Sequence, residues 1–257
     1  MTTQQAVIVV RSEDRYLGTS GASFAVNLPT TFNNVSAISL QSVELPYTFP
    51  NIPLSYCSNV TFTETQPSQI SASYSITEAY WDVNSLCSNL LSFLQTTFPD
   101  LSISAVNYNT LTGIISITIG NSSGVLSVSK GSATKPGLCY VLGVSPTSTT
   151  TSSGGVLTMP NAANLCVNNM LLFQISNLPF NVVSTNSGIG LFRIQLSSGA
   201  NTVLFVDAAS NVGNSVVFNS PITSLSALTI TIVNADNTAL NLRGGEWTFS
   251  IKITYTQ

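Results

Sequence analysis

The sequence predicts an all-β protein whose antiparallel strands form a sandwich or barrel, with a single amphipathic helix. Apolar and polar residues alternate with a period of two in many short runs, which is typical of strands with one buried face. Turn residues separate these runs at intervals of about ten residues, and only one stretch shows the helical period. The 257 residues are enough for one large β domain, or two small ones, with a substantial core.

The C-terminal run is the clearest predicted strand. Its apolar residues alternate with small polar residues and one lysine, and they are Trp247, Phe249, Ile251, Ile253 and Tyr255. Similar runs occupy residues 24–28, 38–45, 60–63, 103–108, 114–119, 171–175, 191–196, 202–206 and 228–233. Turn residues, where we expect the chain to reverse, lie at 29, 33–34, 53, 120–121, 186–188, 198–199 and 234–237.

A helix is predicted at about residues 82–97. Asp82 is a favourable N-cap, and Pro99 is expected to end the helix. The apolar residues between them follow the spacing i, i+3, i+4, i+7, i+8, i+11, and they are Val83, Leu86, Cys87, Leu90, Leu91 and Leu94. One apolar stripe of this kind predicts a helix that lies on a hydrophobic core.

We predict an N-terminal arm at residues 1–22 and one domain at residues 23–257. Residues 7–10 form an apolar stub, and four charged residues follow it within five positions. The stub is alternatively an edge strand of the sheet. Residues 145–155 are rich in serine, threonine and glycine, which predicts a flexible exposed loop. A link between two halves of the fold is the alternative, but neither half carries a complete sandwich by strand count.

The composition excludes several classes of function. Only 7% of the residues are charged, against roughly 25% in an ordinary globular protein. Seven Lys and Arg residues are too few for a basic nucleic-acid-binding face. The sequence contains no histidine, the commonest general base and metal ligand, so a Ser-His-Asp or Cys-His site cannot form. Serine, threonine and asparagine fill more than a third of the chain, which predicts a surface of hydroxyl and amide groups.

The remaining motifs that suggest chemistry are weak, and we expect no enzyme, no cofactor and no metal site. Ser127 and Lys130 match the S-x-x-K pattern of penicillin-recognising enzymes, but they lie in a strand-like run without the partner motifs. Oxygen ligands at Asn234, Asp236 and Thr238 fit a turn better than a calcium loop, because the glycine and distal glutamate are missing. The ten carboxylates are scattered along the chain.

The cysteines, the hydropathy and the N-terminus indicate whether the protein is secreted or spans a membrane. No CxxC pair exists among Cys57, Cys87, Cys139 and Cys166, so we interpret them as four buried free thiols, with two sequential disulfides as the alternative. Mean hydropathy is +0.34, yet no apolar run approaches the roughly 20 residues of a membrane span. The N-terminus lacks the basic start and apolar segment of a signal peptide. We therefore expect a protein that is not secreted.

Residues 11–52 carry the most specific pattern in the chain. It comprises an arm similar to D-S-x-x-R, an F-x-V-x-L strand with a proline, and a segment similar to N-V-x-x-I-x-L-x-S-x-E-I-P-N-x-x-Y-N-I. The residues in register are Phe24, Val26, Leu28, Pro29, Asn34, Val35, Ile38, Leu40, Ser42, Glu44, Pro46, Asn51 and Ile52. This pattern resembles the opening of penton and minor capsid proteins of large eukaryotic DNA viruses and virophages. The departures are Ser12-Glu13 in the arm, Tyr47 in place of asparagine and Pro50 in place of tyrosine. More loosely, residues 107–117 and the Leu142-Gly143 pair also fit the family.

The resemblance implies a single jelly roll with the helix at 82–97 inserted. A double jelly roll, as in the major capsid protein of that lineage, needs a considerably longer chain. It also implies a structural virion protein, most directly a penton that forms a homopentamer at the five-fold vertex beside major capsid proteins. Such a protein is made in the host cytoplasm and resides in the virion, without direct nucleic-acid contact.

Two alternatives remain at this point: a minor or cement capsid protein of the same lineage, and a host-attachment or carbohydrate-binding β-sandwich. For the second, aromatic residues in the first third of the chain would line a groove, namely Tyr47, Phe49, Tyr56, Tyr80 and Trp81. The candidate assembly contacts come from the charged N-terminal segment and from the turn after Pro46. They are Arg11, Asp14, Arg15, Tyr47 and Phe49.

Overall fold

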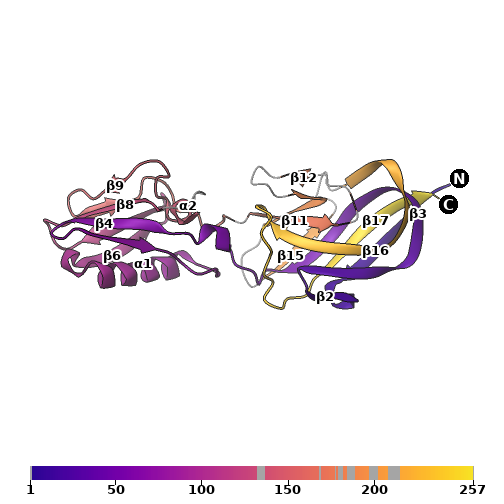
Figure 1. Cartoon of the computed structure of the whole chain (residues 1–257), viewed down its shortest axis with the longest axis horizontal. Coiled ribbons are helices and arrows are strands. Elements are labelled where there is room, and N and C mark those ends of the chain that lie inside the picture. The colour runs from indigo at the N-terminus through magenta and orange to yellow at the C-terminus, as the bar shows by residue number, and fades with distance from the viewer. Residues whose placement is uncertain are drawn as a thin grey trace. The chain divides into compact units, whose positions relative to one another are not determined.

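The computed structural model describes residues 2–131, 137–167, 169–176, 178, 182–183, 189–196, 202–207 and 215–256. The chain forms two compact units (Figure 1). Unit 1 comprises Met1–Phe49 and Asn168–Gln257, and unit 2 comprises Pro50–Val167. Both units are built from antiparallel strands, so the predicted all-β fold class is confirmed. The predicted single domain at 23–257 is instead divided between two units, because residues 50–167 form a unit inserted into the chain of unit 1.

Unit 1 contains one curled antiparallel sheet and a short separate hairpin. Its elements are β1 (Thr3–Arg11), η1 (Ser12–Asp14), β2 (Leu17–Ser20), β3 (Ser23–Pro46), β11 (Met170–Ile175), β12 (Val182–Val183), β13 (Ile189–Gly190), β14 (Phe192–Gln195), β15 (Val203–Asp207), β16 (Ser215–Asn234) and β17 (Thr248–Thr256). The eight-stranded sheet has the order β1-β17-β3-β16-β11-β14, and β2 and β15 also pair with β3. Each of the nine predicted runs in the body of the chain and the C-terminal run contains or overlaps an observed strand.

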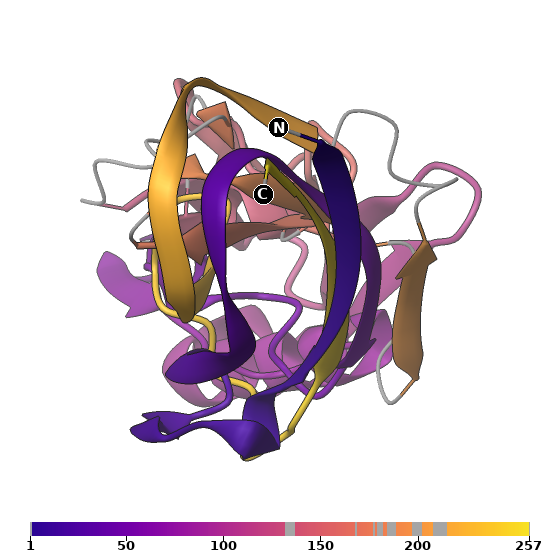
Figure 2. The same ribbon diagram turned by 90° about the vertical axis from the view of Figure 1, so that its right-hand side faces the viewer.

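The two longest strands, β3 and β16, bend over and pass through both layers of the sandwich (Figure 2). Their pairing is interrupted twice, between Asn27 and Phe32 of β3 and between Val217 and Ile222 of β16. Each interruption contains a proline, Pro29 or Pro221. Proline cannot donate to a ladder, so it is accommodated where the ladder is broken and the strand bends.

The predicted chain reversals at Pro29 and at Asn33-Asn34 are therefore wrong, because both lie inside β3. Asn34 adopts a left-handed conformation with φ 49° without ending the strand. The predicted turns at 186–188 and 198–199 lie outside the described residues. The turn at 234–237 is present, with the backbone N–H of Asn237 donating to the carbonyl of Asn234.

Aromatic residues join the two layers of unit 1 across one core. Phe173 of β11 contacts Phe249 of β17, with ring centroids 5.0 Å apart. Trp247, just before β17, contacts Phe24 of β3 in an edge-to-face arrangement at 6.0 Å. Such contacts fix the facing layers more specifically than aliphatic packing does.

Unit 2 combines two small antiparallel sheets with two helices. Its elements are η2 (Leu54–Tyr56), β4 (Val60–Gln66), β5 (Ile70–Tyr74), α1 (Val83–Thr97), η3 (Pro99–Leu101), β6 (Ile103–Asn109), β7 (Ile114–Ile119), β8 (Val125–Lys130), α2 (Gly137–Leu142), β9 (Thr150–Thr151) and β10 (Val156–Thr158). The strand orders are β10-β7-β6 and β5-β4-β8-β9. Between them lies a second hydrophobic core, separate from that of unit 1.

The predicted helix is confirmed as α1, which lies against β6 (Figure 1). The Asp82 carboxylate caps it by accepting hydrogen bonds from the backbone N–H groups of Asn84 and Ser85, both at 2.9 Å. Its fully buried side chains are Leu86, Leu90 and Leu94, and Cys87 is nearly so. No helix among the described residues is long and apolar enough to cross a membrane.

The predicted flexible loop at 145–155 is partly ordered into strand. Thr150 and Thr151 form β9, which pairs with Val128 and Ser127 at the edge of β8. Residues 146–149 of the same segment are exposed. A threonine-rich run can extend a sheet edge because β-branched residues suit the strand conformation.

Cys57, Cys87 and Cys139 are buried and form no disulfide, as predicted, but Cys166 is exposed. Burial raises the pKa of Cys57 to about 11, with the nearby Glu78 adding to the effect. We expect iodoacetamide at pH 8 to label Cys166 in the folded protein far faster than Cys57, because the thiolate is the reacting species. Peptide mass spectrometry of native and denatured samples measures this. Equal labelling of the two cysteines in the native protein would contradict the structure.

Candidate assembly surface

The N-terminal segment is part of the fold of unit 1. Residues 3–11 pair with β17 along its whole length, from Thr3 opposite Thr256 to Arg11 opposite Thr248. Ile8 and Val10 are buried in the core, with 8% and 5% exposure. Residues 7–10 therefore lie in an edge strand, which was the alternative prediction, and not in a separate arm.

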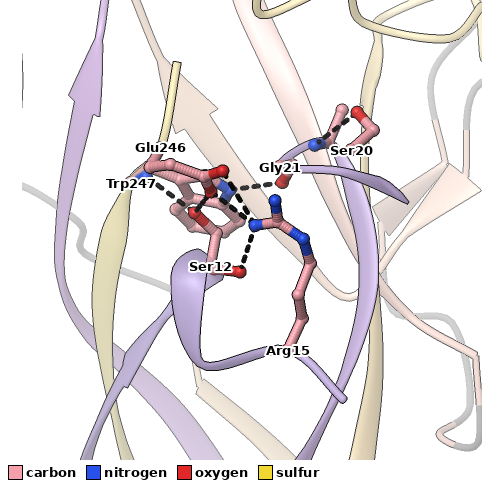
Figure 3. Close-up of polar contacts among 7 residues, drawn as sticks. Ser12, Arg15, Ser20, Gly21, Glu246 and Trp247 are labelled. Carbon is pink, nitrogen blue, oxygen red and sulfur yellow. Dashed lines mark hydrogen bonds and ion pairs between the residues drawn. The ribbon is translucent and has the colours of Figure 1, made fainter. Parts of the chain in front are cut away.

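A polar network fixes the charged residues that follow β1 (Figure 3). The backbone N–H of Ser12 donates to the carbonyl of Trp247, and the backbone N–H of Trp247 donates to the Ser12 hydroxyl, both at 2.9 Å. That hydroxyl in turn donates to the Glu246 carboxylate. Arg15 Nη1 bridges the Ser12 carbonyl at 2.7 Å and both Glu246 oxygens at 2.8 Å. The segment is therefore tied to the start of β17, more than 230 residues away in sequence.

The same network shifts the titration of Glu246. The hydrogen bond from Ser12, together with the Arg15 guanidinium, lowers the pKa of this carboxyl below its ordinary value of 4.5. A group whose pKa is lowered in the folded state stabilises the fold above its ordinary pKa, and that stabilisation is lost as the pH falls through the folded-state value.

We therefore expect Glu246→Gln to lower the melting temperature at pH 7, and the difference from wild type to narrow as the pH falls below 4.5. Melting curves between pH 7 and pH 3 measure this. Glu13→Gln is the control, because Glu13 forms only a surface pair with Arg11 at 3.6 Å, with both side chains 61% exposed. A deficit of the Glu246 variant that stays constant down to pH 3 would contradict the network.

The structure separates the five predicted assembly contacts into two groups. Arg11 and Asp14 are exposed, and Arg15 is half-buried in its contact with Glu246. Tyr47 and Phe49 are buried at 6% and 1% exposure, with ring centroids 4.3 Å apart, in the core of unit 1. Their side chains are covered by the core of unit 1, because the chain turns inward after β3 ends at Pro46.

Other large apolar residues of unit 1 are exposed, and the predicted assembly contacts did not include them. Besides Tyr16 and Leu17, they lie on the outward face of the layer formed by β1, β17, the second half of β3, β15 and the start of β16. The residues of this face are Val7, Val9, Val203, Phe205 and Val217. The sequence did indicate this face in β1, where residues 6–10 are all apolar. A strand with one solvated face normally carries polar residues at alternate positions, so consecutive apolar residues imply that some of them are exposed.

The side chains considered for chemistry have structural roles. The Ser127 hydroxyl donates to the carbonyl of Thr63 at 3.2 Å across the β4–β8 pair. Asp236 Oδ1 accepts from the backbone N–H and hydroxyl of Thr238 inside its turn. No cluster of three or more His, Cys, Asp or Glu side chains suited to a metal occurs in the part of the chain that the structure describes.

The aromatic groove predicted for a carbohydrate site does not form from the residues named, since Tyr47 and Phe49 are buried. Unit 2 instead carries a surface hollow of about 540 Å³ beside α2. Tyr140, whose exposure is 52%, and the amides Asn161 and Asn164 line it. An exposed aromatic ring beside amide groups is an arrangement that a sugar can occupy.

No family model matches the chain, and no curated protein matches it in sequence. Among solved structures, the crystal structure of the mavirus penton protein is similar over 100% of both chains, with a TM-score of 0.59 and 10% sequence identity. The similarity spans the inserted unit 2 as well as unit 1. The chain therefore has a penton-like fold, consistent with an antiparallel jelly-roll sandwich.

Proposed function

We propose that this chain is a structural capsid protein of the penton type, which assembles with copies of itself into a homopentamer at the five-fold vertices of a virion. The observation that carries the proposal is the full-length similarity of fold to the mavirus penton protein. The pattern in residues 11–52 resembles the same class of capsid proteins and supports the proposal independently of the fold.

The surface chemistry suits repeated contacts between proteins. Interface cores are depleted in charge, and this chain has only 17 charged residues, seven basic and ten acidic. Exposed apolar residues on an outward sheet face add area that a neighbour can bury. In this proposal the other partners are the neighbouring major capsid proteins of double-jelly-roll type, and the protein is made in the host cytoplasm and resides in the virion.

The mass of the purified protein in solution and its position in particles test the proposal. We expect light scattering to give a ring of about five times the 27.1 kDa chain mass, and a particle map to place the chain at the five-fold vertices. A location between capsomers would favour a minor or cement protein of the same lineage. Absence from particles would overturn the capsid role.

Carbohydrate binding during host attachment is the second candidate, and the hollow at Tyr140 favours it. In that case the isolated protein binds a glycan array, and Tyr140→Ala removes the binding without changing the melting temperature. A trimer in solution would fit a fibre-head protein better than a penton.

A further inference from the structure

We propose that the outward face of unit 1 docks a second copy of this chain head to tail, with the β1 side of one copy against the β15 side of the next. This inference rests on the proposed function, and it names the surfaces that would close the ring. We call Val7, Val9 and Arg11 rim 1, and Val203, Phe205 and Val217 rim 2.

Rim 1 lies on an edge strand. β1 pairs only with β17 among the described strands, so its other edge has no strand partner there. Val7 and Val9 point outward from it with 63% and 62% exposure, while Ile8 and Val10 point into the core. Apolar residues that are exposed on a long edge strand favour association with another chain.

Rim 2 lies on the opposite side of the same layer. β17 and β15 both pair with residues 42–44 of β3, so they lie on opposite edges of that strand. Phe205 of β15 is 59% exposed, and Val217 of β16 is 75% exposed. Three strand spacings separate β1 from β15, which is about 14 Å.

The centre of the face, between the rims, is polar, with hydroxyl side chains together with Lys252 of β17, opposite Val7 in the register, and Glu44 of β3. One cross-strand row runs from Val9 through Ser250 to Ser42, and the two serine hydroxyls are hydrogen-bonded at 2.6 Å. The bulky apolar groups are therefore confined to the two sides. Two separate apolar sides fit lateral contacts with two neighbours better than one contact across the whole face.

Charge distinguishes the two rims and decides how they pair. Arg11 is exposed on rim 1, where Glu13 contacts it only at 3.6 Å. Glu44 is exposed and directly opposite Phe205 in the register, beside rim 2. A rim 1 to rim 1 contact would bring two arginines together, whereas a rim 1 to rim 2 contact brings Arg11 towards Glu44. Like charges placed together oppose a wrong pairing, so the contact is head to tail, and such contacts close into rings.

The test uses one variant of each rim in the full-length chain. Val9→Asp disables rim 1, Phe205→Asp disables rim 2, and Leu111→Asp in unit 2 is the control, because Leu111 is 95% exposed and belongs to neither rim. We expect each rim variant alone to be monomeric at 27.1 kDa and folded, with the circular dichroism spectrum of wild type. The Leu111 variant should assemble like wild type.

An equimolar mixture of the two rim variants decides the geometry. The Val9 variant keeps rim 2 and the Phe205 variant keeps rim 1, so we expect the mixture to form a dimer and nothing larger by native mass spectrometry. A mixture that stays monomeric, or a Phe205 variant that still assembles like wild type, would overturn head-to-tail docking. If wild type forms a ring and both rim variants form the same ring, this inference is overturned and the proposed pentamer is not. If the wild-type chain is itself monomeric, the proposed pentamer is overturned as well.

The charges provide an independent measurement. Arg11→Glu and Glu44→Arg should each weaken assembly about tenfold, and the double variant should recover most of that loss. A double variant that is weaker than both single variants would contradict the pairing of Arg11 with Glu44.

Discussion

A chain that begins at residue 20 is expected to melt far below the full-length protein or to leave unit 1 unfolded. The truncation removes β1, which pairs with β17 over nine residues and buries Ile8 and Val10. Each of these side chains contributes about 1.5–3 kcal/mol on burial. The truncation also removes Ser12 and Arg15, which bind Glu246, and it uncovers one side of Ile251 and Ile253. Together, the lost burial and the lost hydrogen bonds are comparable with the 5–15 kcal/mol that stabilises a typical domain.

The two tryptophans allow this loss to be assigned to one unit, because Trp247 lies in unit 1 and Trp81 in unit 2. In a Trp81→Phe background, the fluorescence of Trp247 follows the unfolding of unit 1 alone. The full-length Val9→Asp variant is the control, since it changes the outward face of β1 and keeps its pairing. A truncated chain that melts like full-length protein would show that β1 contributes nothing to the fold.

Leu90→Asp is expected to destabilise unit 2 by about 3–5 kcal/mol. Leu90 is completely buried on the inward face of α1, and an aspartate there would leave an unpaired carboxylate in an apolar core. Ser88→Asp is the matched control, because Ser88 lies on the exposed side of the same helix. Urea unfolding monitored by helical circular dichroism measures both variants. A Leu90 variant as stable as the Ser88 variant would mean that the apolar stripe of α1 does not face the core.

The elements that the sequence predicted well have periodic, local signals. The helix α1 carries a cap, an apolar stripe and a terminating proline within 18 residues, and the structure places its ends within one residue of those predicted. The prediction of turns at Pro29 and Asn33-Asn34 was wrong, because a proline in a bent strand has the same local sequence as a proline in a turn. Only the opposing strand β16, nearly 200 residues away, decides between them.

The surface of unit 1 was harder to predict for the same reason. Aromatic residues such as Tyr47 and Phe49 occur both in cores and at contacts between proteins, so their type does not decide their place. Only the tertiary fold shows that these two contact each other in the core. The network of Ser12, Arg15 and Glu246 joins residues from opposite ends of the sequence, for which no pattern exists within a single chain segment. The β15 part of rim 2 was predicted as strand at 202–206, whereas Val217 of β16 lay outside every predicted run, and which residues of β15 face outward depends on its pairing with β3.

The insertion of unit 2 also sets an order of events during synthesis. Residues 50–167 contain all of unit 2, so this unit can fold as soon as it leaves the ribosome. Strand β3 emerges earlier but pairs with β15, β16 and β17, which are made last. At 5–20 residues per second, the last 90 residues take about 5–18 s. During that interval the first strands of unit 1 have no partners, and their apolar faces are exposed. The nascent chain therefore reaches its native fold only if chaperones cover these faces, or if aggregation is slower than synthesis of β17.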